Sequence, residues 1–171
     1  TDAILPPDLE AAGIDKVLIT FSFSTLDDHI GSIFEPGAPL PSSRIVTLRR
    51  TLSENFRSGV SLMPLLPYIT DTDEQLYSMF HTFQRIGIQY IFPASITLFG
   101  EGPHDSKTLM MTAISKHYPQ LEGKYNKFFA YGPQTPSWYR NAFYKKVKLM
   151  CDKFGITNNL LAGFDKSKNS A

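Results

Sequence analysis

Strand-like apolar segments alternate with helical patterns along this chain, and this alternation is its most constraining feature. Strands are predicted over 16–24, 60–66 and 90–98, with helical patterns between them and connections of only a few residues. Parallel strands need a crossover between them, so this order is typical of right-handed strand–helix–strand units. We therefore expect an α/β fold with a parallel sheet.

Short capping signals set the expected ends of the helices. Ser42 or Ser43 is expected to cap the helix between the first two strands, because a serine hydroxyl accepts from free N–H groups at a helix start. Asp71 and Thr72 are expected to cap the next helix, which Gly87 ends. A loop with a short helix is predicted over 2–14, and a polar turn with a short helix near 26–34. Further helices are predicted over about 107–118, 120–129 and 136–154.

The first strand has two chemically different faces. Successive side chains of a strand point to opposite sides. One face therefore carries Ile19, Phe21 and Phe23, and the other carries Thr20, Ser22 and Ser24. A strand buried on both sides is normally apolar on both. The row of hydroxyls faces either solvent or a polar interior that holds a ligand.

Three short strings follow one another around this strand. They read FSFSTLDD at 21–28, FEPGAPLPSSRI at 34–45 and MPLLPYITD at 63–71. In this order they resemble the second half of a radical S-adenosylmethionine enzyme of the spore photoproduct lyase-like branch, often named DNA repair photolyases. There a strand of the type vSittLD is followed by lEPrAPsPeeRl, a helix and a strand of the type PiiPgitD. Each string alone is a weak signal, whereas three in order carry more weight.

The resemblance implies a fold and a division of the chain. We expect the later strands of a partial (β/α)6 TIM-like barrel over 1–118, a C-terminal helical extension over 119–161 and a flexible tail over 162–171. The family's three cysteines, spaced Cys-x3-Cys-x2-Cys, hold a [4Fe-4S] cluster and do not occur in this sequence. We therefore expect the chain to be the C-terminal half of a longer protein, with the missing N-terminal half of the barrel as its partner.

For the full-length enzyme, the resemblance implies lyase-like radical chemistry. The cluster would reductively cleave S-adenosylmethionine to a 5′-deoxyadenosyl radical that abstracts hydrogen from a substrate. This chain would supply groups that position the cofactor and part of the substrate wall, and would be inactive alone. Photoproduct repair in the same branch makes nucleic acid a candidate substrate.

Arg44, Ser22 and Ser24 are the residues expected to bind S-adenosylmethionine. In related radical enzymes an arginine in a string like eeRl takes the cofactor carboxylate, and SSRI matches that position. A guanidinium offers a planar bidentate fork, and the first turn of a helix also favours an anion. Alternatively, Arg44 forms a salt bridge with Glu35 or Asp28. The two serines offer hydroxyls to the ribose or the amino acid end, or simply pack in the barrel interior.

The expected substrate pocket lies where the strands end, because ligands bind at the carboxyl ends of parallel strands. Tyr68 and Asp71 follow the second strand, and Ser95 and Thr97 end the third. We expect these residues and the cofactor site to face one crevice. Tyr68 is alternatively a packing residue. The glycine-rich loop 99–106 either holds a phosphate or the adenine on its amides, or is only a turn and a helix cap.

The formal charge of +1 hides an asymmetry along the chain. Residues 1–106 hold 6 Lys or Arg and 13 Asp or Glu, whereas residues 107–171 hold 11 and 3. The basic last third is interleaved with aromatic residues, a mixture that grips phosphates and stacks on bases. The alternative is a helical end with a lysine-rich solvated face and aromatics in the core. The aromatics are Tyr125, Phe128, Phe129, Tyr131, Trp138, Tyr139, Phe143 and Tyr144.

Cysteine and histidine content limit the other chemistry. The single cysteine, Cys151, lies among apolar residues of a predicted helix and is expected to be a buried core thiol. One cysteine fits a reducing cytosol, so the expected location is cytoplasmic. The four histidines lack metal-ligand spacing, so no metal site is expected in this chain. No apolar run approaches the roughly 20 residues that span a bilayer, so no membrane partner is expected.

Two other classes of protein fit the same sequence. The first is a non-catalytic α/β binding module, whose gene never encoded the half of the protein that holds the iron–sulfur cluster. A Cys-x3-Cys-x2-Cys motif encoded upstream of this sequence would exclude this class. The second is a scaffold or interaction protein, in which the half-barrel forms a homodimer to cover open sheet edges. A strict monomer in dilute solution would argue against that second class.

Overall fold

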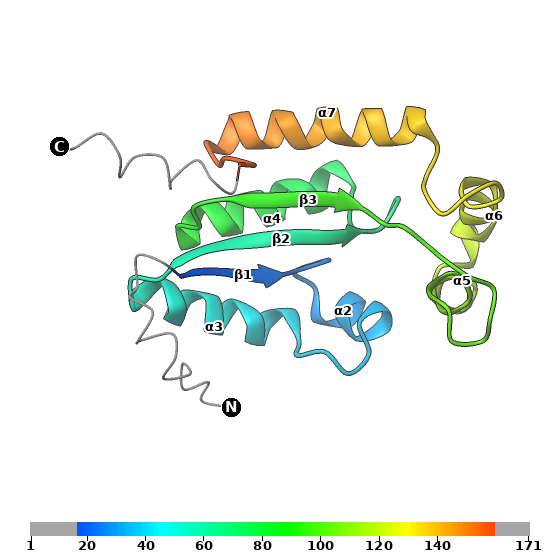
Figure 1. Cartoon of the computed structure of the whole chain (residues 1–171), viewed down its shortest axis with the longest axis horizontal. Coiled ribbons are helices and arrows are strands. Elements are labelled where there is room, and N and C mark those ends of the chain that lie inside the picture. The colour runs from blue at the N-terminus through cyan, green and yellow to red at the C-terminus, as the bar shows by residue number, and fades with distance from the viewer. Residues whose placement is uncertain (1–16, 160–171) are drawn as a thin grey trace.

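The computed structural model describes residues 17–159 of the chain (Figure 1). The helix predicted over 2–14 and the tail predicted over 162–171 lie outside the described residues. The described part is an α/β fold with one three-stranded parallel sheet, as the alternation of strands and helices predicts. Its elements are, in order, β1 (Leu18–Ser22), α2 (Asp28–Phe34), α3 (Pro41–Ser53), β2 (Arg57–Leu65), α4 (Asp73–Ile86), β3 (Ile91–Ser95), α5 (Ser106–His117), α6 (Pro119–Phe128) and α7 (Ser137–Phe154).

β2 is the central strand of the sheet. β1 pairs with it in parallel, starting with Leu18 opposite Arg57. β3 pairs in parallel with the other side of β2, and the register shifts between Leu62 and Leu65. Pro64 lies within that interval, and a proline has no N–H to complete a regular ladder. The irregularity falls toward the C-terminal end of β2.

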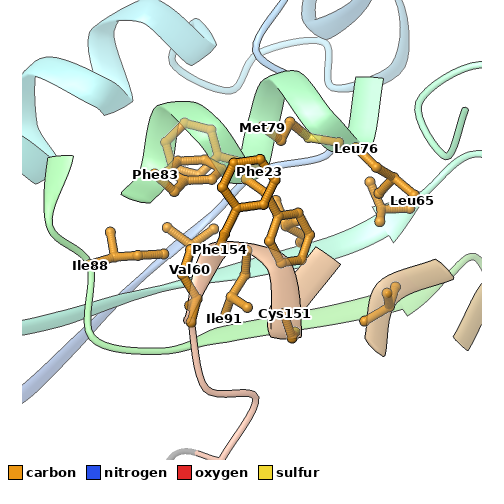
Figure 2. Packing of buried hydrophobic residues seen from close by; sticks show 14 of the residues in the cluster. Phe23, Val60, Leu65, Leu76, Met79, Phe83, Ile88, Ile91, Cys151 and Phe154 are labelled. Carbon is orange, nitrogen blue, oxygen red and sulfur yellow. The ribbon is translucent and has the colours of Figure 1, made fainter. Parts of the chain in front are cut away.

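One face of the sheet is covered by α3, α4 and α7, which form the main hydrophobic core with it (Figure 2). Phe23 from the end of β1, Leu48 of α3 and Phe83 of α4 are fully buried. The rings of Phe23 and Phe83 lie 5.1 Å apart between centroids. Cys151 and Phe154 add α7 to this core, so the prediction of a buried thiol is confirmed. Burial of each large apolar side chain contributes about 1.5–3 kcal/mol.

The opposite face of the sheet is left open by the described chain (Figure 1). Thr20 and Ser22 of β1 and Met63 of β2 are exposed on it. The ring of Tyr90 covers Gly59 on this side so closely that a Cβ atom on that glycine would overlap the ring. The Tyr90 hydroxyl lies 2.5 Å from Thr20 Oγ1. The predicted polar face of β1 therefore borders open space rather than the main core.

A second hydrophobic core lies beyond the carboxyl ends of the strands, where α5 and α6 cover the segments that follow β2 and β3. Leu66, Leu98, Ile114 and Tyr125 are buried there. The Tyr125 hydroxyl donates to the Pro67 carbonyl at 3.0 Å. The helices α5 and α6 therefore cap one end of the sheet instead of flanking it (Figure 1).

The two edges of the sheet differ. Next to β3, the Ile91 N–H donates to the Thr157 carbonyl at 2.9 Å, and the Leu98 N–H donates to the Pro133 carbonyl at 2.7 Å. C-terminal segments thus occupy part of that edge. Within residues 17–159, β1 pairs only with β2. Its outer edge therefore presents N–H and C=O groups that a further strand could use.

The helix starts depart from the predicted caps in two places. The serine cap predicted for α3 is wrong, because α3 begins at Pro41 and no side chain caps it. Ser42 instead donates to Asp28, through its N–H at 2.9 Å and its hydroxyl at 2.6 Å. The start of α4 is capped by Thr72, as predicted. Asp71 does not cap this helix, since its carboxylate is used elsewhere.

Candidate functional site

Glu35 links the residues that were predicted to bind a cofactor. Its Oε1 accepts from the Ser24 hydroxyl, and its Oε2 lies 2.6 Å from Nη2 of Arg44. Nη1 of Arg44 donates to the Ser22 carbonyl at 2.7 Å. The three predicted residues therefore meet around one carboxylate at the end of β1.

Two aspartates fix the positions of α2 and α3 around this cluster. Asp27 caps α2 by accepting from the first backbone N–H groups of that helix, at 2.7 and 3.0 Å. Asp28 ties the start of α3 to α2 through Ser42. The hydrogen bonds from Ser42 lower the pKa of Asp28 below its ordinary value. Because α2 and α3 are held together in this way, Glu35 after α2 faces Arg44 in the first turn of α3.

The guanidinium of Arg44 is largely buried. Its side chain is 14% exposed, and Cζ lies 5.1 Å from the centroid of the Phe23 ring. Nε and Nη2 are buried and have no acceptor in hydrogen-bond geometry within the described chain, so Nη2 depends on its ion pair with Glu35. Buried donors are normally satisfied. Because Nη1 and Nη2 are engaged by the Ser22 carbonyl and by Glu35, Nε–H is the donor of Arg44 that remains for an anion.

The two predicted serines have different roles. The Ser22 hydroxyl lies on the open face of the sheet and donates to the Met63 carbonyl at 3.1 Å. Ser24 lies past the end of β1, is 1% exposed and donates to Glu35. The exposed row of hydroxyls on β1 therefore consists of Thr20 and Ser22, without Ser24.

A cavity of about 620 Å³, here called the strand-end pocket, lies at the carboxyl ends of β2 and β3. Ser95 and Thr97, two of the predicted substrate-pocket residues, line it. The Ser95 Oγ is buried without a hydrogen-bond partner in the described chain. A pocket of this size suits a small organic group with a few polar contacts. The other lining residues are mostly apolar: Ile33, Phe34, Pro36, Met63, Pro64, Ile96, Leu98, Ser106, Leu109, Met110 and Ala113.

The strand-end pocket shares a chain segment with the arginine cluster. Phe34 and Pro36 line the pocket, and Glu35 lies between them in sequence. Glu35 in turn holds Arg44. The arginine cluster and the strand-end pocket therefore draw on neighbouring residues of the same connector.

Tyr68 and Asp71 line a different cavity, of about 410 Å³, here called the aromatic pocket. Its other walls include Trp138, Tyr139 and Lys146 of α7. The sequence predicted that all the pocket residues face one crevice. The structure instead divides them between two cavities, because α7 lies against the loop that follows β2.

Asp71 is buried and fastens that loop to α7. Its Oδ1 accepts from the Tyr68 N–H at 2.8 Å, and its Oδ2 accepts from the Tyr139 hydroxyl at 2.6 Å. Its backbone carbonyl accepts from Nζ of Lys146 at 2.9 Å. Burial raises the pKa of Asp71, although these partners oppose the shift. Burial and the neighbouring carboxylate raise the pKa of Tyr139, so its phenol stays a donor.

Tyr68 is packed between helices. Its backbone is left-handed, with φ 62°. Its ring centroid lies 5.7 Å from that of Phe128 and 5.3 Å from that of Tyr139, and Nζ of Lys124 lies 4.3 Å from it. These contacts favour the packing role that was the alternative prediction.

The glycine-rich loop before α5 is closed by its own hydrogen bonds. The Gly102 N–H donates to Oδ2 of Asp105 at 2.7 Å, and the Phe99 N–H donates to the Ser106 hydroxyl at 2.9 Å. Since these amides are already used, the loop is better described as a turn before a helix than as a phosphate site.

The described residues do not fit an iron–sulfur cluster. Within 17–159, no three or more His, Cys, Asp or Glu side chains are placed to hold a metal ion. The only cysteine of the chain, Cys151, is buried in the main core, and burial raises the pKa of its thiol. Metal ligation needs the thiolate, which such surroundings disfavour.

Two residues of these sites were missed as functional candidates. Glu35 was named only as an alternative salt-bridge partner of Arg44, although both residues lie in the same string, FEPGAPLPSSRI. Tyr139 was not expected to pair with Asp71. No local pattern joins residues that lie 68 positions apart.

Comparison with known proteins gives relatives without an assigned activity. The chain is 24% identical over 156 residues to uncharacterized proteins of Mycobacterium tuberculosis and Mycobacterium bovis, covering 91% of this chain and 44% of each relative. It is 31% identical over 81 residues to an uncharacterized protein of Acidianus two-tailed virus, covering 46% of this chain and 27% of that protein. No protein-family profile and no solved structure matches the chain.

The chain spans less than half of the length of these relatives. Among the helices of the described part, none combines the length and the apolar character needed to cross a bilayer.

Proposed function

We propose that this chain is part of a radical S-adenosylmethionine enzyme of the spore photoproduct lyase-like type. One observation carries the proposal: the cluster of Ser22, Ser24, Glu35 and Arg44, in which a largely buried arginine has one donor, Nε–H, without an acceptor within the described residues. The residues of this cluster come from the strings that resemble the family. In the proposal, the three strands are later strands of a partial (β/α)6 barrel.

Each residue of the cluster has a defined task in this proposal. Arg44 would bind the carboxylate of S-adenosylmethionine through Nε–H, the donor that has no acceptor within residues 17–159. Glu35 and the Ser22 carbonyl would fix the plane of the guanidinium. When bound, the cofactor supplies a 5′-deoxyadenosyl radical for hydrogen abstraction. The strand-end pocket would exclude water from the reacting group of the substrate.

The cluster ligands would belong to a preceding half of the protein. Supporting observations are the length of the relatives, more than twice that of the aligned segment, and the outer edge of β1, which pairs with no other strand among the described residues. A preceding strand of the barrel would pair with that edge, and the open face of the sheet would become the barrel interior. A cytoplasmic location belongs to the proposal, because a reducing compartment suits the single cysteine.

The first test uses the longest open reading frame that contains this sequence. Protein purified without oxygen is assayed for iron and sulfide, and S-adenosylmethionine binding is measured by equilibrium dialysis. We expect about four irons per chain and a loss of affinity of tenfold or more, about 1.4 kcal/mol, for Arg44→Ala. Arg49→Ala, an exposed arginine on the same helix, is the matched control. Absence of iron after reconstitution would overturn the proposal.

DNA repair is the narrowest form of this function. It predicts anaerobic turnover of a thymine photoproduct by the reconstituted full-length enzyme. If the enzyme binds the cluster and the cofactor but does not turn over the photoproduct, the proposal of a radical enzyme stands and photoproducts are excluded as its substrate.

A second candidate is a scaffold that associates through the sheet, or a binding module with the same surfaces. It is favoured by the outer edge of β1, which has no strand partner within residues 17–159. Such an edge is a template for pairing with another chain. Light scattering of this chain that gives a dimer, together with a gene that lacks the cluster cysteines, would favour this candidate over the enzyme.

A further inference from the structure

The end of α6, the loop 129–136 and the first turns of α7 form a basic and aromatic region, here called the α6–α7 surface. Residues 127–145, which span this surface, contain three Lys or Arg and no Asp or Glu. This excess of positive charge makes the region attractive to a polyanion.

Large aromatic side chains are exposed on the α6–α7 surface. Tyr131 is fully exposed, and Trp138 is 61% exposed. Tryptophan is highly buried on average, so an exposed one is informative. Phe128 and Tyr139 hold its indole edge-on, with ring centroids 5.8 and 5.6 Å away at angles of 83° and 81°. The indole is thus fixed in orientation while much of it stays open to solvent.

Cations lie next to these rings. Lys127 and Tyr131 line one shallow cavity of about 380 Å³. Lys145 follows Trp138 by seven positions on α7 and is exposed, so both lie on the same face of that helix. Exposed rings and cations therefore occur together on the α6–α7 surface.

We propose that the α6–α7 surface binds single-stranded nucleic acid. Bases stack on Trp138 and Tyr131, and phosphates contact Lys127 and Lys145. Stacking needs bases whose faces are free, which a duplex does not offer, and aromatic platforms interleaved with cations are typical of single-strand binding. This inference goes beyond the proposed radical chemistry, because it needs neither S-adenosylmethionine nor a cluster.

The α6–α7 surface is tied by backbone pairing to the strand-end pocket. The Leu98 N–H donates to the Pro133 carbonyl at 2.7 Å, and Thr97 and Gln134 form an antiparallel bridge. Gln134 borders the same cavity as Tyr131, whereas Thr97 lines the strand-end pocket. α6, the start of α7 and the segments that follow β2 and β3 lie at the end of the molecule to which the strands point (Figure 1). A strand held on the surface therefore passes close to the pocket.

The test uses the intrinsic fluorescence of the full chain, because Trp138 is its only tryptophan. The 171-residue protein is titrated with an oligothymidylate of about 12 nucleotides, and anisotropy of a labelled oligonucleotide gives the affinity. We expect quenching of the indole and an affinity that falls as salt rises. Trp138→Ala should weaken binding about tenfold or more, and Trp138→Phe should keep most of it.

Controls separate stacking from attraction to any polyanion. Arg49→Ala, an exposed cation on α3, should leave the affinity unchanged. A duplex of the same length should bind more weakly. The proposal is overturned if the indole is not quenched, if Trp138→Ala binds like wild type, or if heparin and the duplex bind as tightly as the single strand. These measurements need no iron. A negative result here therefore refutes binding of single-stranded nucleic acid without refuting the proposed radical enzyme.

Discussion

Arg44 and Glu35 form an ion pair whose nearest atoms are 2.6 Å apart, with side chains only 14% and 22% exposed. The Arg50–Glu54 pair on the same helix α3 is 3.1 Å long, and its side chains are 51% and 36% exposed. Water weakens the attraction between exposed charges, and a partly buried pair leaves a charge unsatisfied when one partner is removed. The Arg44–Glu35 pair is therefore the one that organises the end of β1.

Removing the Glu35 carboxylate should destabilise the chain. Glu35→Ala leaves Nη2 of Arg44 without its ion-pair partner and the Ser24 hydroxyl without its acceptor, which should lower the free energy of unfolding by about 1–3 kcal/mol. Glu54→Ala should lower it by less than about 1 kcal/mol. Urea denaturation followed by circular dichroism measures both. Equal effects of the two substitutions would contradict a structural role for the pair.

Gly59 should not tolerate a side chain. An added Cβ would overlap the ring of Tyr90, so Gly59→Ala must displace that ring from Thr20. Such overpacking costs about 1–3 kcal/mol. Gly123 in α6 has open space where an added methyl group would lie, so Gly123→Ala should stabilise the helix by about 0.5–1 kcal/mol. Opposite shifts of the thermal midpoint are expected for the two variants.

The pH dependence of stability should contain a contribution from Asp71. Burial raises its folded-state pKa above the ordinary value of 3.8, so the folded chain binds this proton more tightly than the unfolded chain does. Its contribution is then full at low pH and is lost as pH rises through the folded pKa. Asp71→Asn cannot titrate. Wild type should therefore gain stability relative to this variant when pH is lowered from about 7 to about 4.

Urea midpoints of both proteins at the two pH values measure that difference. Asp71→Ala serves as the control for lost hydrogen bonds, since it orphans the Tyr68 N–H and the Tyr139 hydroxyl. Those two losses should lower the free energy of unfolding by about 1–3 kcal/mol each at either pH. A wild-type advantage that shrinks on acidification would contradict the raised pKa.

The parallel sheet and its helices were predictable because they depend on local patterns. Apolar periodicity and the αL glycine at Gly87, with φ 87°, decide the elements within a few residues. The cap of α3 was not predictable from Ser42 alone, because Asp28 competes for that serine from 14 positions away. Local capping rules cannot weigh a tertiary partner.

In the candidate site, too, contacts between residues close in sequence were predictable and contacts between distant elements were not. Arg44, Ser22 and Ser24 were found from strings close in sequence, and their common partner Glu35 lies within the same stretch. The placement of Asp71 was missed, because it depends on where α7 packs against the loop after β2. Contacts between elements far apart in the chain are set by packing of the whole domain, which no short window contains.

The docking of α7 on the sheet can be tested through Cys151, the only cysteine of the chain. The thiol is 8% exposed in the main core, and burial raises its pKa. Reaction with a thiol reagent should therefore be at least about 100-fold slower in native buffer than in urea, which corresponds to about 2.7 kcal/mol for opening α7. Asn141→Cys in a Cys151→Ser background places an exposed thiol on the same helix and should react at once. If wild type reacts as fast as that control, α7 does not stay packed on the main core in this chain by itself. The segment that holds α7 in place would then be sought in the additional length of the relatives.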